Sequence, residues 1–231
     1  MTVGPTFGKL HYQLYKLFPF LEKRASLVLS LPPDPVLVDV GSSFGRNLDG
    51  FQILRKDLRI HAIDMGDFRS AVESKGCIFH QIDLIADPLP FDSETVDCVT
   101  AMHILEHLEN VNHLLGEARR VLKPQGRLFV EVPSIRSLFV PSFHFGRSGH
   151  SHTFNFYDDP THLRPYSVNG LRRLLEDNGL RVIRSGISRN WLFFIFSPLL
   201  IGCGVFSRFL FHAGIINLVG WSVYCIAEPR T

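Results

Sequence analysis

The segment VLVDVGSSFGRNL, residues 36–48, constrains the fold of this chain more than any other part of the sequence. An apolar run rich in β-branched residues ends at Asp39, and Gly41 and Gly45 follow closely. The run predicts a buried strand, and the glycines allow a tight turn in which the backbone approaches a ligand. A helix after this turn would present free N–H groups. We therefore predict a strand, a ligand-binding turn and a helix over these residues.

Further β-rich runs follow at intervals, with helical patterns between several of them. The runs cover residues 59–64, 77–82, 96–101, 127–132, 180–188 and 221–227, and the clearest helical patterns cover 104–123 and 167–178. Strands that alternate with helices indicate βαβ units. We therefore expect an α/β fold with a mostly parallel sheet and helices on both of its faces.

The length suits one such domain, and the composition excludes several classes of protein. The chain has 231 residues, of which 45% are hydrophobic and 20% charged, which is typical of a folded α/β domain. A net charge of +2 gives no basic field, so we expect no nucleic-acid partner. The four cysteines lack CxxC spacing, and the first thirty residues lack a secretory signal pattern. We expect a cytoplasmic location, and leave association with a membrane surface open.

Three segments depart from the regular strand–helix pattern. Residues 1–34 carry apolar side chains at helical spacing, interrupted by Pro19, which predicts an amphipathic helical lead-in before a single domain over 35–231. Residues 143–166, rich in histidine and aromatic side chains, are expected to form a lid-like loop. Residues 190–220 are expected to form an apolar insertion before the last strand.

Acidic residues stand at the ends of the first three predicted strands. Asp39 and Asp64 end the first two, and Asp83 follows the third. Ligands of parallel sheets bind beyond the carboxyl ends of the strands, and an acid about 20 residues past a glycine loop is placed to bind ribose hydroxyls. The loop has the pattern D-x-G-x-x-x-G, which differs from the G-x-G-x-x-G dinucleotide motif and disfavours a nicotinamide enzyme.

Five sequence elements in order carry a resemblance to a known family. DVGSSFG, HAIDMGD, HQIDLIADPLPFDSETVDCV, HILEHLEN and ARRVLKPQGRLFVEVPS resemble class I S-adenosylmethionine-dependent methyltransferases. The branch that they resemble most includes ubiquinone-biosynthesis O-methyltransferases and sugar- or lipid-modifying relatives. The resemblance covers about residues 35–190, with a last strand at 221–228. It implies a Rossmann-like, doubly wound, seven-stranded sheet whose last strand is antiparallel.

The resemblance also implies S-adenosylmethionine as the cofactor. By resemblance, the loop from Gly41 to Gly45 wraps the methionine moiety, Asp64 holds the ribose, and Asp83 with Leu84 recognises adenine. The residues implied in cofactor binding are Asp39, Gly41, Ser43, Gly45, Asp64, Met65, Asp83, Leu84 and His103. Ser43 replaces a glycine that the family often has, so a strongly positive φ at residue 43 would be strained.

Methyl transfer to a hydroxyl is the reaction that we expect, and histidine is the usual base at neutral pH. His162, within the sequence DPTH, and His107 are the catalytic candidates. His162 is the stronger candidate, although it could instead hold its loop in place by hydrogen bonding. A catalytically silent binding or scaffold protein with the same fold is the alternative from another functional class.

A possible metal site is formed by His103, Glu106 and His107, whose side chains share one face if the segment is helical. The ubiquinone-pathway relatives carry an acid-rich version of this segment that is linked to a divalent metal. His103 in place of an acid argues against a hard cation, although the three groups could bind a transition metal. We favour the simpler interpretation that Glu106 and His107 stabilise the start of a helix, and we predict no metal.

The apolar stretch within 190–220 sets this chain apart. Its uncharged run, residues 191–207, is short for a bilayer span and contains Pro198. We favour a peripheral membrane contact through 191–216 that also covers the pocket of a small or lipid-linked acceptor. A homodimer interface and simple packing of helices on the sheet remain open alternatives.

Overall fold

One seven-stranded sheet organises the part of the chain that the computed structural model describes, namely residues 12–142, 154–205 and 207–230. The strands are β1 (Val36–Val40), β2 (Arg59–Asp64), β3 (Ile78–Gln81), β4 (Val96–Met102), β5 (Leu122–Pro133), β6 (Leu180–Ser188) and β7 (Ser222–Pro229). Their order across the sheet is β3-β2-β1-β4-β5-β7-β6. The first five strands pair in parallel, and β7 runs antiparallel to both β5 and β6. The predicted doubly wound sheet with an antiparallel last strand is confirmed.

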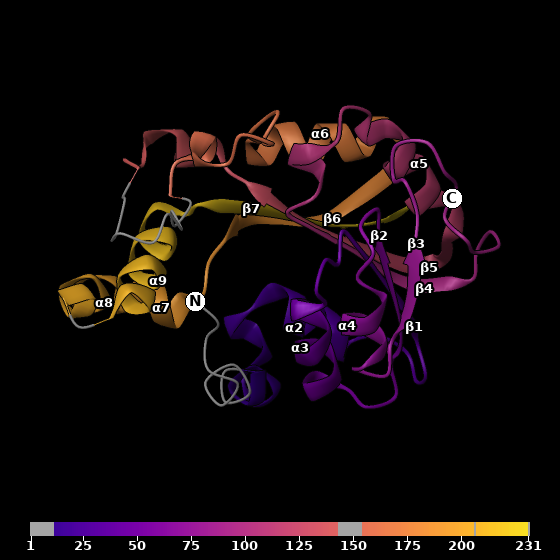
Figure 1. The fold of residues 1–231 in the computed structure, drawn as a ribbon, viewed down its shortest axis with the longest axis horizontal. Coiled ribbons are helices and arrows are strands. Elements are labelled where there is room, and N and C mark those ends of the chain that lie inside the picture. The colour runs from indigo at the N-terminus through magenta and orange to yellow at the C-terminus, as the bar shows by residue number, and fades with distance from the viewer. Residues whose placement is uncertain (1–11, 143–153, 206, 231) are drawn as a thin grey trace.

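Helices cover both faces of this sheet (Figure 1). On one face lie α2 (Lys23–Leu29), α3 (Arg46–Leu54) and α4 (Arg69–Glu73), and on the other lie α5 (Val111–Val121) and α6 (Val168–Asp177). Alternate residues of β1 point to opposite faces, so Leu37 packs in the core with Phe51 of α3, whereas Val38 packs in the core with Leu114 of α5. Two buried cores therefore hold the strand ends in fixed positions.

The chain order reverses between β1 and β4, which are neighbours in the sheet. After β1, the chain builds outward through β2 and β3, and then crosses back to place β4 on the other side of β1. Such a switch point leaves a crevice beyond the carboxyl ends of the two strands, where ligands of doubly wound folds bind. The loops after β1 and β4 are therefore the first place to look for a site.

The structure corrects the helix predicted over residues 104–123. A short 3-10 helix, η2 (Leu105–His107), is followed by extended backbone at Leu108, and α5 begins only at Val111. His103 has a φ of +53° and donates its backbone N–H to the Glu131 carbonyl at 2.8 Å, so it extends the β4–β5 pairing. His103 therefore does not share a helical face with Glu106, and the expectation that these side chains are aligned by one helix is wrong.

The amino-terminal segment is a series of short helical pieces. Residues 12–17 are helical, η1 (Pro19–Leu21) follows, and Glu22 caps α2 by accepting the backbone N–H groups of Arg24 and Ala25. Pro19 has no N–H to donate, which interrupts the longer helix that the apolar spacing suggests. This segment lies on the same side of the sheet as α3 (Figure 1), and it brings Arg24 toward the strand ends.

The remaining helical elements lie between the strands at the far end of the sheet. After β5 come η3 (Ile135–Phe139) and η4 (Phe156–Asp158); residues 143–153 of the predicted lid lie outside the described residues. Between β6 and β7 come α7 (Trp191–Ile195), α8 (Ser197–Gly202), η5 (Cys203–Val205) and α9 (Arg208–Val219), grouped beyond the end of the sheet (Figure 1). None of the helices in the described residues has both the length and the apolar character needed to cross a bilayer.

Candidate functional site

The loop after β1 approaches the β4 end of the sheet closely, and glycine permits that approach. Gly41 has a φ of +72°, and a Cβ atom added to it would lie 2.8 Å from Cγ1 of Ile104. Gly45, with a φ of +68°, is the N-cap of α3. A side chain at either position would strain the backbone, and at Gly41 it would also collide with the Ile104 side chain. Glycine is thus required by the geometry of this loop.

Ser43 adopts a backbone conformation in which a residue other than glycine is strained. Its φ is +47°, in the left-handed region. The backbone N–H of Ser43 donates to Oδ2 of Asp64 at 2.8 Å, and this charge-assisted hydrogen bond offsets a cost of about 1 kcal/mol for a non-glycine residue in this region. Strain of this kind is often found at ligand sites.

Asp39, at the end of β1, is buried, and only one of its two carboxylate oxygens has a hydrogen-bond partner among the described residues. Its Oδ1 accepts the Thr100 hydroxyl at 2.6 Å, whereas the buried Oδ2 has no partner among the described residues. Burial raises the pKa of Asp39 to about 7, although the Thr100 hydrogen bond and the Arg24 charge act in the opposite direction. An unpaired buried carboxylate oxygen at a switch point fits a polar ligand or an ordered water molecule.

Asp64 and Asp83 lie at the same edge of the sheet because β2 and β3 are parallel and Asp64 pairs in register with Gln81. Asp64 accepts the backbone N–H of Gly66 at 3.0 Å as well as that of Ser43. A carboxylate has about four lone-pair positions, so further acceptor capacity remains for hydroxyl groups of a ligand. Met65, immediately after Asp64, is 67% exposed and is available to contact a planar group.

The loop after β3 contains an acidic and an apolar group in sequence. Oδ1 of Asp83 accepts the N–H of Ile85 at 2.9 Å, which closes a turn directly after the strand. The Leu84 side chain is buried in the core on the α5 face of the sheet. Leu84 therefore supports the loop by packing, and Asp83 is the polar group of the pair at this strand end.

His103, after β4, lies between two carboxylates. Its Nδ1 is 3.3 Å from Oε1 of Glu106, and its Nε2 is 3.6 Å from Oε1 of Glu131. Desolvation disfavours the charged imidazole, but the interactions with Glu106 and Glu131 outweigh it and raise the pKa of His103 to about 10. His103 is therefore a cation at neutral pH and is unsuited to act as a base there.

Arg24 is a site residue that the sequence analysis missed. Its guanidinium donates to Oδ1 of Asn47 at 3.2 Å and to the Tyr12 hydroxyl at 2.9 Å. Its buried Nε lies 3.7 Å from Oε2 of Glu22 and has no hydrogen-bond partner among the described residues. Its charge also acts on Asp39 and on Glu131. Arg24 is a single basic residue in an amphipathic segment. Nothing in the sequence indicates that its side chain reaches the end of β1, more than ten residues further along the chain. The site thus contains a cation whose charge favours the ionised form of Asp39.

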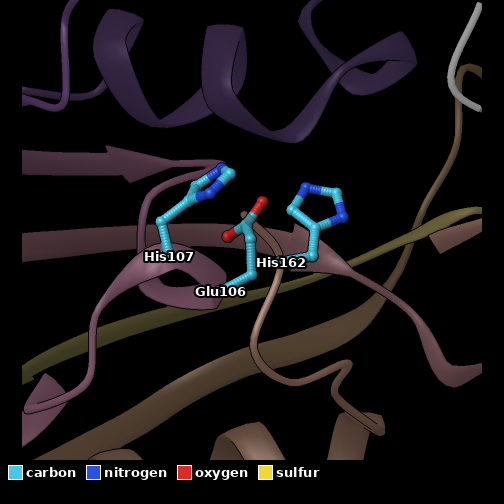
Figure 2. A group of neighbouring side chains, drawn as sticks. All are labelled: Glu106, His107 and His162. Atoms are coloured by element: carbon cyan, nitrogen blue, oxygen red, sulfur yellow. The ribbon is translucent and has the colours of Figure 1, made fainter. Parts of the chain in front are cut away.

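The two predicted catalytic histidines are brought together with Glu106 (Figure 2). One potential ligand atom from each of Glu106, His107 and His162 lies within 4.8 Å of the others. The ring centroids of His107 and His162 are 4.8 Å apart. His107 also lies within hydrogen-bonding distance of Thr161, which is 54 positions away in the sequence. Glu106 also contacts His103, so this cluster adjoins the strand-end residues.

The structure therefore joins the predicted residues into two connected groups. The loop from Gly41 to Gly45 is tied to Asp64 by a hydrogen bond, and Asp39 lies at its base. His107 and His162 form the second group around Glu106, which His103 connects to the end of β4. Asp83 lies along the same sheet edge as Asp64, with no hydrogen bond to the loop that begins at Gly41.

Comparison with known proteins identifies the family. The "Methyltransferase domain" family matches residues 10–185. Curated relatives include the ubiquinone/menaquinone biosynthesis C-methyltransferases UbiE of Pectobacterium atrosepticum and Pectobacterium carotovorum, each 30% identical over 95 residues. Those 95 residues are 40% of this chain and 37% of each relative, so the match spans less than two fifths of the relatives' length.

Solved structures show the same fold. A chain of the complex between the Haloferax volcanii Trm112 methyltransferase activator and a methyltransferase superposes with a TM-score of 0.66 and 18% identity, covering 96% of this chain and 94% of that one. Geranyl diphosphate C-methyltransferase from Streptomyces coelicolor superposes with a TM-score of 0.59 and 13% identity, covering 90% and 77%. With a family match over most of its length, and with the sheet order and strand-end loops described above, this chain belongs to the methyltransferase domain family.

Proposed function

We propose that the protein is an S-adenosylmethionine-dependent methyltransferase. The observation that carries the proposal is the arrangement at the β1–β4 switch point: a glycine loop with no room for a Cβ at Gly41, an unpaired buried oxygen of Asp39, and Asp64 bonded to the loop backbone. Membership of the methyltransferase domain family supports the same conclusion. A phosphate-free cofactor also needs no long glycine loop for a pyrophosphate group.

Each proposed binding residue has a chemical counterpart on S-adenosylmethionine. The remaining lone pairs of Asp64 accept the ribose hydroxyls, Met65 contacts the adenine face, and Asp83 accepts from its edge. Gly41, Ser43 and Gly45 shape the loop around the methionine moiety, and Asp39 orients that loop or accepts from the ammonium group through its unpaired oxygen. Arg24 supplies the cation for the carboxylate end.

The bound cofactor supplies an electrophilic methyl carbon, and the chain must hold an acceptor in line with it. His162 and His107 are the proposed catalytic residues on the acceptor side. Nδ1 of each ring has a partner, which leaves Nε2 to take a proton from an acceptor hydroxyl. His103 remains a proposed cofactor-pocket residue, and its charge is already balanced by Glu106 and Glu131.

The acceptor is proposed to be a small or lipid-linked molecule that is methylated on oxygen. The free Nε2 atoms favour an acceptor that loses a proton. Carbon is the second candidate for the methylated atom, because the matched curated relatives and one structural neighbour are named C-methyltransferases. The position of the labelled methyl group in the product, read by nuclear magnetic resonance, separates oxygen from carbon.

Cofactor binding is the first expected result. Isothermal titration of the protein with S-adenosylmethionine, and separately with S-adenosylhomocysteine, should give one site per chain for each. Incubation with methyl-labelled cofactor and fractionated cell extract should then transfer label to an extracted small molecule or lipid. Failure of both cofactors to bind a folded protein would refute the proposal, and binding without transfer to any fraction would favour the silent binding protein.

Membrane contact through residues 191–216 is proposed as the route to a lipid-linked acceptor. Within α7, α8 and the residue that joins them, five apolar side chains are at least 36% exposed. They are Trp191, Leu192, Ile195, Phe196 and Leu199. Grouped exposed apolar residues of this kind mark interaction surfaces. The helices that carry them lie beyond the end of the sheet, on the side of α9 (Figure 1).

The wild-type protein should sediment with phospholipid vesicles, and the double variant Ile195→Asp, Leu199→Asp should bind them at least about tenfold more weakly. Insertion of each of these side chains contributes about 1.5–3 kcal/mol, and a charge reverses that gain. Ile78→Asp is the matched control, because Ile78 is an equally apolar, 52% exposed residue on the edge strand β3. Equal vesicle binding by both variants, or a wild-type protein that does not bind vesicles, would contradict the proposal.

A further inference from the structure

One ring nitrogen of His162 makes a hydrogen bond within the protein, and the other does not among the described residues. Its Nδ1 lies 2.7 Å from the Phe156 carbonyl oxygen. A carbonyl can only accept, so Nδ1 carries a proton, and in the neutral ring Nε2 carries the lone pair. Nε2 is 4.0 Å from the nearest oxygen of Asp159, which is beyond hydrogen-bonding distance. In the neutral ring, Nε2 is thus an acceptor without a hydrogen-bond partner among the described residues, on a side chain that is nearly buried.

The His107 ring has the same tautomer, set by a different chain of contacts. Its Nδ1 lies 2.9 Å from the hydroxyl of Thr161, and that hydroxyl lies 2.6 Å from Oδ1 of Asp159. The single hydroxyl hydrogen goes to the carboxylate, so the hydroxyl oxygen accepts from Nδ1–H of His107. The Nε2 atom of His107 therefore also carries a lone pair. Histidines that bind metals are characteristically oriented in this way by a second group on the opposite nitrogen.

Glu106 contributes the third acceptor. The residue is fully buried, its Oε1 is paired with His103, and its Oε2 has no partner among the described residues. Figure 2 shows its carboxylate between the two imidazole rings. Three acceptor groups thus face one another with no donor between them, and a buried unpaired carboxylate oxygen is costly unless a cation lies beside it.

We propose that Glu106, His107 and His162 bind a divalent transition-metal ion of the Zn²⁺ type. Two neutral imidazole nitrogens and one carboxylate oxygen form a ligand set that such ions prefer, and three protein ligands leave a fourth position for water or for the acceptor. This set replaces the one considered from the sequence, because His103 is occupied by two carboxylates and His162 comes from a distant segment. Because one Nε2 lone pair cannot bind a metal and accept a proton at once, this proposal replaces the base role proposed above. With metal bound, a water in the fourth position would be the proton acceptor.

The geometry requires a modest closure. Ligand atoms around a tetrahedral ion with bonds of about 2.1 Å lie about 3.4 Å apart. The three atoms now lie within 4.8 Å of one another, so no pair has to approach by more than about 1.4 Å. Side-chain rotation at Glu106, His107 or His162 would have to supply a movement of this size.

Metal content tests the proposal without any reference to methyl transfer. Protein purified without a polyhistidine tag is stripped with a chelator and dialysed against Co²⁺ or Zn²⁺. One equivalent of metal per chain is expected, with the visible absorption of a four-coordinate Co²⁺ site. His162→Ala and His107→Ala should each weaken binding by about 100-fold or more, since loss of an outer-shell partner alone costs 10–100-fold.

Matched variants separate this site from other histidines and from loss of folding. Thr161→Val keeps all three ligands but removes the partner of His107, and it should weaken binding by about 10–100-fold. His113→Ala, at an exposed ring whose Nε2 is bonded to the Asp87 carbonyl, should bind metal as the wild type does. The metal-free melting temperature of each variant reports folding; if His162→Ala does not fold, the half-buried His107 carries the test. A folded wild-type protein that takes up no metal, or uptake unchanged in both histidine variants, would overturn the proposal.

Discussion

Replacement of Asp64 by alanine is expected to weaken S-adenosylmethionine binding by about 100-fold or more while the protein remains folded. In the proposed site this carboxylate accepts two ribose hydroxyls, and each hydrogen bond to a charged group contributes about 1.5–3 kcal/mol, with 1.4 kcal/mol equal to a factor of ten in affinity. The variant also releases the N–H of Ser43, which the carboxylate now holds at 2.8 Å. Loss of that contact frees a loop whose φ of +47° at Ser43 needs support.

Titration calorimetry with both S-adenosylmethionine and S-adenosylhomocysteine measures this effect, because both share the ribose. Asp67→Ala is the matched control, since Asp67 lies three residues further along the same loop and its carboxylate accepts only the N–H of Arg69, at 3.2 Å, among the contacts described. That variant should bind within about twofold of the wild type. Equal losses in the two variants, with unchanged thermal melting, would show that Asp64 is not a cofactor ligand.

Most of the fold was predictable because its signals are local. The bounds of β1, β2 and β6 agree with the β-rich runs read from the sequence, since a turn residue or a polar group stands at or just after the end of each run. Helix α6 begins after Ser167, which caps it by accepting the N–H of Gly170, a contact that the residue types themselves favour. The helix predicted over 104–123 failed because its apolar spacing gives no sign of the break at the non-helical residues 108–110.

The candidate site was predictable only in part because its contacts are long-range. Strand-end acids such as Asp39 and Asp64 follow from a rule about parallel sheets, so their convergence could be expected. By contrast, the approach of His162 to Glu106 and of Arg24 to Asn47 depends on how separate segments pack on the sheet. The left-handed Ser43 was missed because a serine carries no signal for positive φ; the Asp64 carboxylate supplies the compensating contact.

The Asp39→Asn variant is expected to remove a large pH dependence from the stability of the protein. Burial raises the pKa of Asp39 to about 7 in the folded protein, above the ordinary value of 3.8 that the unfolded chain retains. Between these two values the folded state holds a proton that the unfolded state has lost, so the wild-type free energy of unfolding decreases as the pH rises and levels off above about pH 7. Asparagine does not titrate, and its Oδ1 still accepts the Thr100 hydroxyl.

The difference in the free energy of unfolding, variant minus wild type, isolates this residue from all other titrating groups. It should increase by about 4 kcal/mol between pH 4 and pH 8, because one pKa unit corresponds to 1.36 kcal/mol. Urea unfolding across this range measures it, and Asp67→Asn, at an exposed carboxylate, is the matched control. A difference that stays flat for Asp39→Asn would mean that water or another group already compensates the buried charge. A rising difference would mean that the folded protein keeps a carboxylate where it costs stability, as expected of a residue retained for a ligand and not for packing.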